Sequence, residues 1–249
     1  MKKKILFFSF LLFIFCSFNL LAENFPQKAS KIEDFIPKGW KTLIIKKGDL
    51  NKDKIEDVVL IIEKNDPKNF RKAESLFYAP KDNANFNPRI ILVLLKDKNS
   101  QYNLVAKNEE GFITSEGKSY EEVIQNIDNQ NSISIKNNTL RIYTSFEAVR
   151  AFYSTEYTFR YQNNKFELIG LEAKDEGASG YDIENNRYSI NFSTKKLEKY
   201  TSKEKTDSNE KAKEEKSVKN IDIKDKYILD TMEETTVNEI LDKYVYKNY

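Results

Sequence analysis

Short runs of aliphatic and β-branched residues, separated by polar turns, most restrict how this chain of 249 residues can fold. Between about Thr42 and Thr194 the runs are only five or six residues long, a length that suits buried strands better than helices. The clearest of them are Thr42–Lys46, Asp57–Ile62 and Ile90–Leu95. The pattern predicts a mainly β fold of antiparallel strands and hairpins.

Two pairs of neighbouring runs are joined by asparagines, which tolerate the positive φ angles that tight hairpins need. One hairpin is predicted around Asn137 and Asn138, and the other around Gln162–Asn164. Their strands are Ser132–Lys136 with Thr139–Thr144, and Tyr157–Tyr161 with Lys165–Leu171. Aromatic residues recur at every second position of the second hairpin, and we interpret that face as part of the core rather than as a ligand platform.

Polar segments separate some of these runs. We predict that Lys64–Asn87 is a long surface insertion and that Gly170–Asn186, which contains two glycines, is a loop. Ser119 and Glu122 stand at the spacing of a capping box, which indicates a helical turn within Ser119–Asp128.

The composition changes after Thr194. Lys195–Lys216 is dominated by Lys, Glu, Ser, Thr and Asn. Such a segment has too little apolar surface to offset the entropy that it would lose on ordering, and we therefore predict a flexible charged spacer. Asn220–Leu229 is predicted to form a strand, and Thr231 to open a helix that ends near Tyr246. The apolar face of that helix comprises Val237, Ile240, Leu241 and Tyr244.

Met1–Ala22 has the three parts of a secretory signal. Lys2–Lys4 are basic, Ile5–Phe18 is shorter than a membrane span, and Ala22 is a small residue at the cleavage site. The bulky residues before Cys16 disfavour lipid attachment there. We therefore expect a periplasmic or secreted protein without a stable membrane anchor after signal cleavage. The predicted organisation is a signal peptide at 1–22, a β-rich domain at 23–194, a flexible charged linker at 195–217 and a C-terminal strand and helix at 218–249.

Charge and the absence of histidine exclude several classes of function. The chain has 41 basic and 39 acidic residues, and loss of the three signal lysines leaves 38 against 39. No basic surplus remains for nucleic-acid binding. The chain contains 0 histidines, which excludes Ser-His and Cys-His catalysis and imidazole metal sites. Metal sites with oxygen ligands are still open.

The segment Gly48–Asp57 carries the one motif with recognisable chemistry. Asp or Asn recurs at loop positions 1, 3, 5 and 9, and a hard divalent cation requires several oxygens around one point. We predict a Ca²⁺ site with side-chain ligands and one backbone carbonyl, from Asp49, Asn51, Asp53, Asp57 and, through its carbonyl, Ile55. Three converging carboxylates would otherwise repel one another. The alternative is an acidic β-turn without an ion.

This loop departs from the EF-hand pattern. Lys54 occupies position 6, where glycine is usual, and a non-glycine residue there costs about 1 kcal/mol. Leu60 occupies position 12, where an EF-hand has a bidentate glutamate, so an EF-hand is excluded.

Gly48–Ile62 instead resembles the Asp-rich calcium loop of the FG-GAP, or integrin-alpha N-terminal-like, repeat, in which the loop joins two strands. More broadly, Phe35–Glu63 together with Tyr157–Thr194 is similar to uncharacterised exported bacterial proteins that carry one such loop. The resemblance implies a β-rich fold with one calcium loop and brings no activity with it. The loop occurs once, whereas a multi-bladed propeller would repeat it.

We expect a non-catalytic, calcium-stabilised module that binds a protein or glycan partner in the envelope or outside the cell. An inhibitor or immunity-type protein would have the same size and compartment. A hydrolase with paired carboxylates is a further alternative, because such enzymes need two carboxyl groups about 5–10 Å apart. Its candidate residues are Glu147, Glu156, Glu172 and Asp175.

Overall fold

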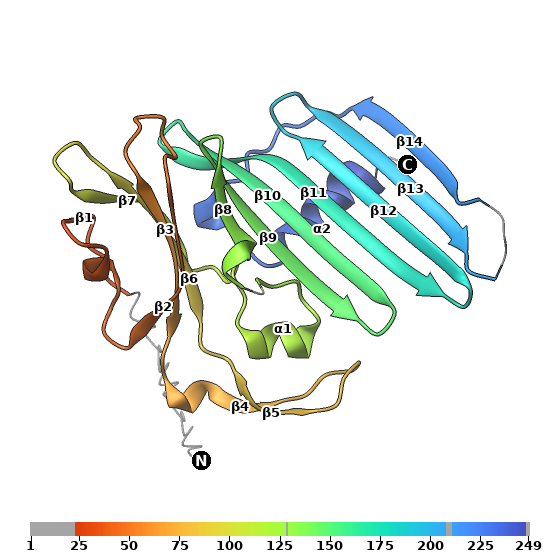
Figure 1. The fold of residues 1–249 in the computed structure, drawn as a ribbon, viewed down its shortest axis with the longest axis horizontal. Helices are drawn as coiled ribbons and strands as arrows, with labels where there is room; N and C mark the ends of the chain where they lie inside the picture. The colour runs from red at the N-terminus through yellow and green to blue at the C-terminus, as the bar shows by residue number, and fades with distance from the viewer. Residues whose placement is uncertain (1–22, 128, 208–210, 248–249) are drawn as a thin grey trace, which may run out of the picture.

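The computed structural model describes residues 23–127, 129–207 and 211–247. Its strands form a five-stranded sheet, a seven-stranded sheet and a two-stranded ribbon, all antiparallel (Figure 1). The prediction of a mainly β fold with antiparallel sheets and a short C-terminal helix is therefore confirmed. The predicted signal at 1–22 lies outside the described residues. Within the described part, no helix is long and apolar enough to cross a membrane.

The five-stranded sheet contains the three aliphatic runs that the sequence predicts as strands. Its order is β1 (Lys28–Ala29), β7 (Tyr102–Asn108), β6 (Arg89–Lys96), β3 (Asp57–Lys64) and β2 (Trp40–Gly48). The central strands β3 and β6 are apolar on both faces, and Leu60 stands opposite Leu92 in their register. One face packs against the N-terminal segment through Phe25 and Phe35, which is the last residue of a short 3₁₀ turn (Ile32–Phe35). The other face packs against the seven-stranded sheet.

The seven-stranded sheet is a chain of hairpins in which each strand pairs with the next. Its order is β14 (Lys213–Asn220), β13 (Lys196–Lys205), β12 (Asp182–Asn191), β11 (Lys165–Ser179), β10 (Ala151–Gln162), β9 (Thr139–Ala148) and β8 (Ile133–Lys136). Both predicted asparagine hairpins are confirmed: Asn137, Asn138, Asn163 and Asn164 all have φ between 52° and 56°. Tyr157 and Phe159 face the core, as predicted.

The C-terminal segment covers part of the inner face of this sheet (Figure 1). It contains a 3₁₀ turn (Leu229–Thr231), α2 (Thr236–Leu241) and a π-helical turn (Asp242–Tyr246). Val237, Ile240 and Tyr244 are buried and Leu241 packs beside them, so the predicted apolar face is correct. The helix begins at Thr236 rather than Thr231. The strand predicted at Asn220–Leu229 is wrong, because beyond Asn220, which ends β14, only Ile228 makes a bridge, to Glu167.

The predicted flexible linker at 195–217 is wrong for the described residues of that range, which form β13 and most of β14. The loop predicted at Gly170–Asn186 is also mostly strand, in β11 and β12. The physical reason is the same in both places. A strand added to a sheet gains backbone hydrogen bonds whatever its side chains are, and one face of an antiparallel sheet can remain solvated without apolar residues.

The remaining elements are short. The predicted insertion Lys64–Asn87 contains a 3₁₀ turn (Pro67–Asn69) and the ribbon of β4 (Phe70–Ala73) and β5 (Lys81–Asn85). α1 (Glu116–Glu122) is followed by a 3₁₀ turn (Gln130–Ser132). The α1 N-cap is Ser115, whose Oγ accepts from the Lys118 N–H at 3.3 Å, so the predicted cap at Ser119 is wrong. The Ser119 hydroxyl instead donates to the Ile124 carbonyl at 2.6 Å.

Candidate functional site

The Asp-rich loop joins β2 to β3 and rests on the β8–β9 hairpin. A Cβ atom on Gly48 would lie 2.8 Å from the Ile135 side chain, so only glycine permits this close approach. The Asn138 side-chain amide donates to the Asp49 carbonyl at 2.9 Å. The contact of Gly48 with Ile135 and the hydrogen bond from Asn138 to Asp49 therefore hold the loop against the β8–β9 hairpin.

The carboxylate of Asp49 folds the loop around itself. It accepts from the Lys52 N–H at 2.7 Å and from the Lys54 N–H at 3.1 Å. Lys52 and Lys54 have φ values of 70° and 68°, in the left-handed region. The sharp turn that usually requires glycine at position 6 is thus made here by lysine.

Asn51 and Asp53 lie together in the middle of the loop. Asn51 Oδ1 accepts from the Asp53 N–H at 3.0 Å, and its amide nitrogen donates to Asp53 Oδ2 at 2.9 Å. The Ile55 N–H donates to the other Asp53 oxygen at 2.7 Å. The side chains of Asp49, Asn51 and Asp53 are therefore each already hydrogen-bonded within the loop.

Asp57 is fully buried at the start of β3. Its two oxygens accept from the Leu50 N–H at 2.8 Å and from the Lys96 N–H at 2.9 Å, which ties the loop to β6. Burial raises the pKa of Asp57; those two hydrogen bonds oppose the rise, and the negative charges of Asp53 and Asp49 add to it. The structure thus brings the three predicted carboxylates close enough to influence one another.

The ligand types in this loop fit a hard cation, because each carboxylate offers about four lone-pair sites and the hydrogen bonds above use only some of them. In the arrangement described, however, no three Asp, Glu, Cys or His side chains of the described residues gather closely enough to hold a metal ion. Backbone N–H groups close the loop instead. Calcium binding at Asp49, Asn51, Asp53, Ile55 and Asp57 stays a prediction.

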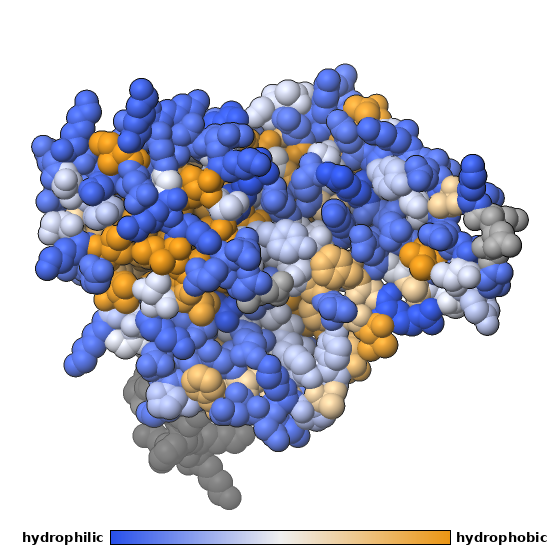
Figure 2. Space-filling view, viewed as in Figure 1, coloured by the Kyte–Doolittle hydropathy of each residue, from blue (hydrophilic) through white to orange (hydrophobic). Residues whose placement is uncertain are grey.

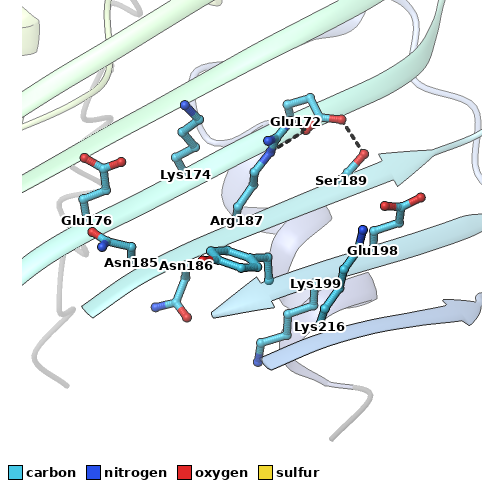
Figure 3. Close-up of a pocket in the computed structure, with 11 residues that line it drawn as sticks. Glu172, Lys174, Glu176, Asn185, Asn186, Arg187, Ser189, Glu198, Lys199 and Lys216 are labelled. Carbon is cyan, nitrogen blue, oxygen red and sulfur yellow. Dashed lines mark hydrogen bonds and ion pairs between the residues drawn. The ribbon is translucent and has the colours of Figure 1, made fainter. Parts of the chain in front are cut away.

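The outer face of the seven-stranded sheet is the second candidate site, and Figure 3 shows its centre. A hollow of about 580 Å³ lies over β11–β14. It is lined by charged and polar side chains, with one tyrosine: Glu172, Lys174, Glu176, Asn185, Asn186, Arg187, Ser189, Glu198, Lys199, Tyr200 and Lys216. The Arg187 guanidinium contacts Glu172 at 3.1 Å, and the Ser189 hydroxyl donates to the same carboxylate.

Charges on this face are sorted into rows across the strands. The strand register places Lys174, Arg187, Tyr200 and Lys216 opposite one another in turn, and we call these four residues the basic row. A second row lies two residues further along the strands and is aligned in the same way. We call it the acidic row, and it consists of Glu156, Glu172, Ser189 and Glu198. Like charges directly opposite each other destabilise a sheet, and the ion pair between Arg187 and Glu172, which joins the two rows, offsets part of that repulsion.

The four carboxylates proposed for a hydrolase do not gather into one cluster. Glu156 and Glu172 stand opposite each other, but Arg141 contacts Glu156 at 2.9 Å as Arg187 contacts Glu172. Asp175 belongs to the inner side of β11, where burial raises its pKa and the charge of Glu184 adds to the rise. Glu147 stands near the end of β9.

Sequence reasoning missed Arg187, Ser189, Glu198 and Tyr200. Glu198 and Tyr200 lie in the segment predicted to be a linker, and Arg187 and Ser189 directly follow the segment predicted to be a loop. A signal was present in the alternation of buried Tyr188 and Ile190 with polar neighbours in β12. Comparison of the chain with protein-family models, with curated proteins and with solved structures gave no match.

Proposed function

We propose that the protein is an exported, non-catalytic binding module that presents the outer face of its seven-stranded sheet to a protein or glycan partner. The observation that carries this proposal is the sorting of charge into the basic row and the acidic row. Lys174 faces Arg187, and Glu156 faces Glu172, across neighbouring strands. A partner with complementary charges relieves that repulsion, so the rows supply both attraction and register.

The chemistry of this face supports binding rather than catalysis. Glu172 is engaged by both Arg187 and Ser189, and Glu156 by Arg141, so neither is free to act as an acid or a base. The face above β11–β14 is largely hydrophilic in Figure 2, with a few hydrophobic residues among the polar ones, and the pairing of the strands fixes the order of its side chains. Tyr200 adds an aromatic contact of the kind enriched in protein interfaces.

Export and calcium complete the proposal. The signal-like sequence of Met1–Ala22 supports export of the mature chain to the periplasm or the exterior, and N-terminal sequencing of the protein from an extracytoplasmic fraction tests cleavage after Ala22. Bound Ca²⁺ would neutralise the carboxylates of the Asp-rich loop and stiffen its attachment to both sheets.

The binding test uses immobilised wild type, Arg187→Glu and the matched control Lys98→Glu, which makes the same charge change in the exposed β6–β7 turn. We expect wild type and the control to retain the same partner from envelope extract and Arg187→Glu to lose it. A glycan array with the same three proteins distinguishes a sugar from a protein partner. Equal retention by Arg187→Glu, with its melting temperature unchanged, contradicts the proposal.

A further inference from the structure

Large apolar and aromatic side chains are exposed mainly at one end of the molecule. Among the described residues eight such side chains are exposed, and five of them come from three neighbouring turns or their flanks. They are Leu76 and Phe77 between β4 and β5, Val149 and Tyr153 around the β9–β10 turn, and Tyr181 in the β11–β12 turn. We call Leu76, Phe77, Val149 and Tyr181 the tip surface.

The three turns adjoin one another. The Tyr78 hydroxyl donates to the Glu147 carbonyl, which joins the β4–β5 loop to the end of β9. Arg150 donates to the Gly180 carbonyl at 2.7 Å and accepts, through its own carbonyl, from the Ala178 N–H at 2.9 Å. In Figure 1 the three turns follow each other along the lower right edge, where Figure 2 shows several hydrophobic patches.

The exposure of these side chains has no explanation in the fold. Leu76 is 94% exposed, Val149 80%, Tyr181 67% and Phe77 60%, so they contribute little to the core. Single apolar residues on a surface need no explanation, but a cluster of them from separate turns marks an interaction site. Their grouping at one end of the molecule therefore marks this end as a candidate interaction surface.

Their surroundings combine aromatic rings with paired charges. Behind the tip surface, the Tyr78 ring lies 5.4 Å from Tyr120 and 6.2 Å from Phe146. The cations of the β4–β5 ribbon are neutralised, since Arg71 contacts Glu121 at 2.8 Å. Lys72 likewise pairs with Glu74, and Lys81 with Glu116. Arg150 at the tip instead donates to a backbone carbonyl. Amphipathic aromatic residues behind protruding apolar ones, with little net charge, match the interfacial zone of a lipid bilayer.

We propose that the tip surface docks on a lipid bilayer and inserts Leu76, Phe77 and Val149 into its interfacial zone. Each of these side chains protrudes from a turn, and a fluid interface accommodates separate insertions, whereas the core of a protein interface is contiguous and closely packed. This contact is peripheral and reversible. It goes beyond the proposed function, because it uses the turns rather than the outer sheet face.

The test uses the chain from Glu23 onward, which contains every described strand and helix. Sedimentation with zwitterionic phosphatidylcholine vesicles measures the partition of the wild type, and the double variant Leu76→Asp/Phe77→Asp should lower it about tenfold or more. The matched control is Val218→Asp, at a 55% exposed valine of the edge strand β14, which should partition like the wild type. Because most charged side chains around the tip surface are paired with opposite charges, partition into the vesicles should change little with salt concentration.

A spectroscopic readout reports insertion itself. In Phe77→Trp, vesicles should shift tryptophan emission to the blue, after subtraction of the wild-type spectrum, whose 1 tryptophan is Trp40. Absence of wild-type partition at millimolar lipid, or equal loss in Val218→Asp, overturns the proposal. Self-association that disappears in the double variant, without any vesicle binding, assigns the tip surface to protein docking and also overturns it.

Discussion

At the residue scale, Asp57 acts as a structural anchor of the Asp-rich loop. Its carboxylate pairs two backbone N–H groups, of Leu50 within the loop and of Lys96 at the end of β6. No water reaches the side chain, since it is fully buried. Asp53 differs, because its hydrogen bonds with Asn51 and Ile55 are exposed to solvent. The two carboxylates of one motif therefore contribute to stability in different ways.

We predict that Asp57→Ala lowers the free energy of unfolding by about 2–4 kcal/mol, because two N–H groups lose their partner and each buried unsatisfied group costs about 1–3 kcal/mol. This cost should persist in chelator, because the two backbone N–H groups lose their partner whether or not calcium is present. Asp53→Ala in chelator should cost under about 0.5 kcal/mol, as exposed polar groups return to water. Urea unfolding of both variants measures these costs, and equal costs contradict the division of roles.

Calcium should act through Asp53. With millimolar Ca²⁺ and a dissociation constant of about 10⁻⁴ M, binding to the folded state stabilises it by about 1.4 kcal/mol. For a domain of about 200 residues that raises the melting temperature by about 3–6 °C. The rise should be lost in chelator and in Asp53→Ala, and Mg²⁺ should produce less. Identical melting curves with calcium and chelator would leave an acidic turn without an ion.

Glu63 makes stability depend on pH. Burial by itself raises its pKa, but hydrogen bonds from Arg89, Lys41 and Asn85, together with the charge of Arg89, lower the pKa overall. A carboxylate whose folded-state pKa is depressed adds stability above its unfolded pKa of about 4.3, and that stability is lost as pH falls through the folded pKa.

The expected result is that Glu63→Gln costs most near neutral pH and progressively less below about pH 4. Urea unfolding of wild type and variant between pH 3 and 7 measures this difference. Glu74→Gln, which removes an exposed carboxylate, serves as the control and should show little dependence. If the cost of Glu63→Gln does not change with pH, the ion pair with Arg89 does not lower the pKa of Glu63 in the folded protein.

At the scale of elements, the sequence predicts strands where apolar residues recur and fails where they do not. β3 and β6 are buried on both faces, so their runs are continuous and easily recognised. β13 and β14 carry Lys and Glu on exposed faces, and their strand state comes from pairing with the neighbouring strand rather than from their own composition. The Asp-rich loop is visible in sequence because its spacing is local, whereas the rows on the outer face depend on register between strands.

The second asparagines of the two hairpins, Asn138 and Asn164, differ in the contact that Asn138 makes with Asp49, which gives a matched pair of variants. Asn164 has φ 56° and Asn138 also has φ 56°, and glycine adopts this conformation without strain. We predict that Asn164→Gly stabilises the fold by about 0.5 kcal/mol. Asn138→Gly should instead destabilise it by about 0.5–1 kcal/mol, because the hydrogen bond to the Asp49 carbonyl is lost. Thermal unfolding of both variants tests the pair, and gains of equal size would show that Asn138 does not hold the loop.

At the scale of the whole molecule, the C-terminal segment joins the two sheets. One hydrophobic cluster contains Val93 of the five-stranded sheet, Phe159 of the seven-stranded sheet and Ile240 of α2. The Asn108 side-chain amide on β7 donates at 2.7 Å to the carbonyls of both Leu229 and Met232. The described C-terminal segment from Ile221 to Val245 is therefore packed into the same core as the rest of the fold.

This shared core predicts a single cooperative unfolding transition. Trp40 reports on the five-stranded sheet, and far-ultraviolet circular dichroism reports mostly on the seven-stranded sheet, which has more strands. Both signals should change at the same urea concentration. Ile240→Ala truncates a fully buried side chain of α2 and should lower the free energy of unfolding by about 2–5 kcal/mol. Both signals should shift together, although Trp40 lies in the five-stranded sheet and α2 covers the seven-stranded sheet. Two separate transitions, of which the variant shifts only the one seen by circular dichroism, would contradict this prediction. The molecule would then consist of two folding units, with the C-terminal segment belonging to one of them.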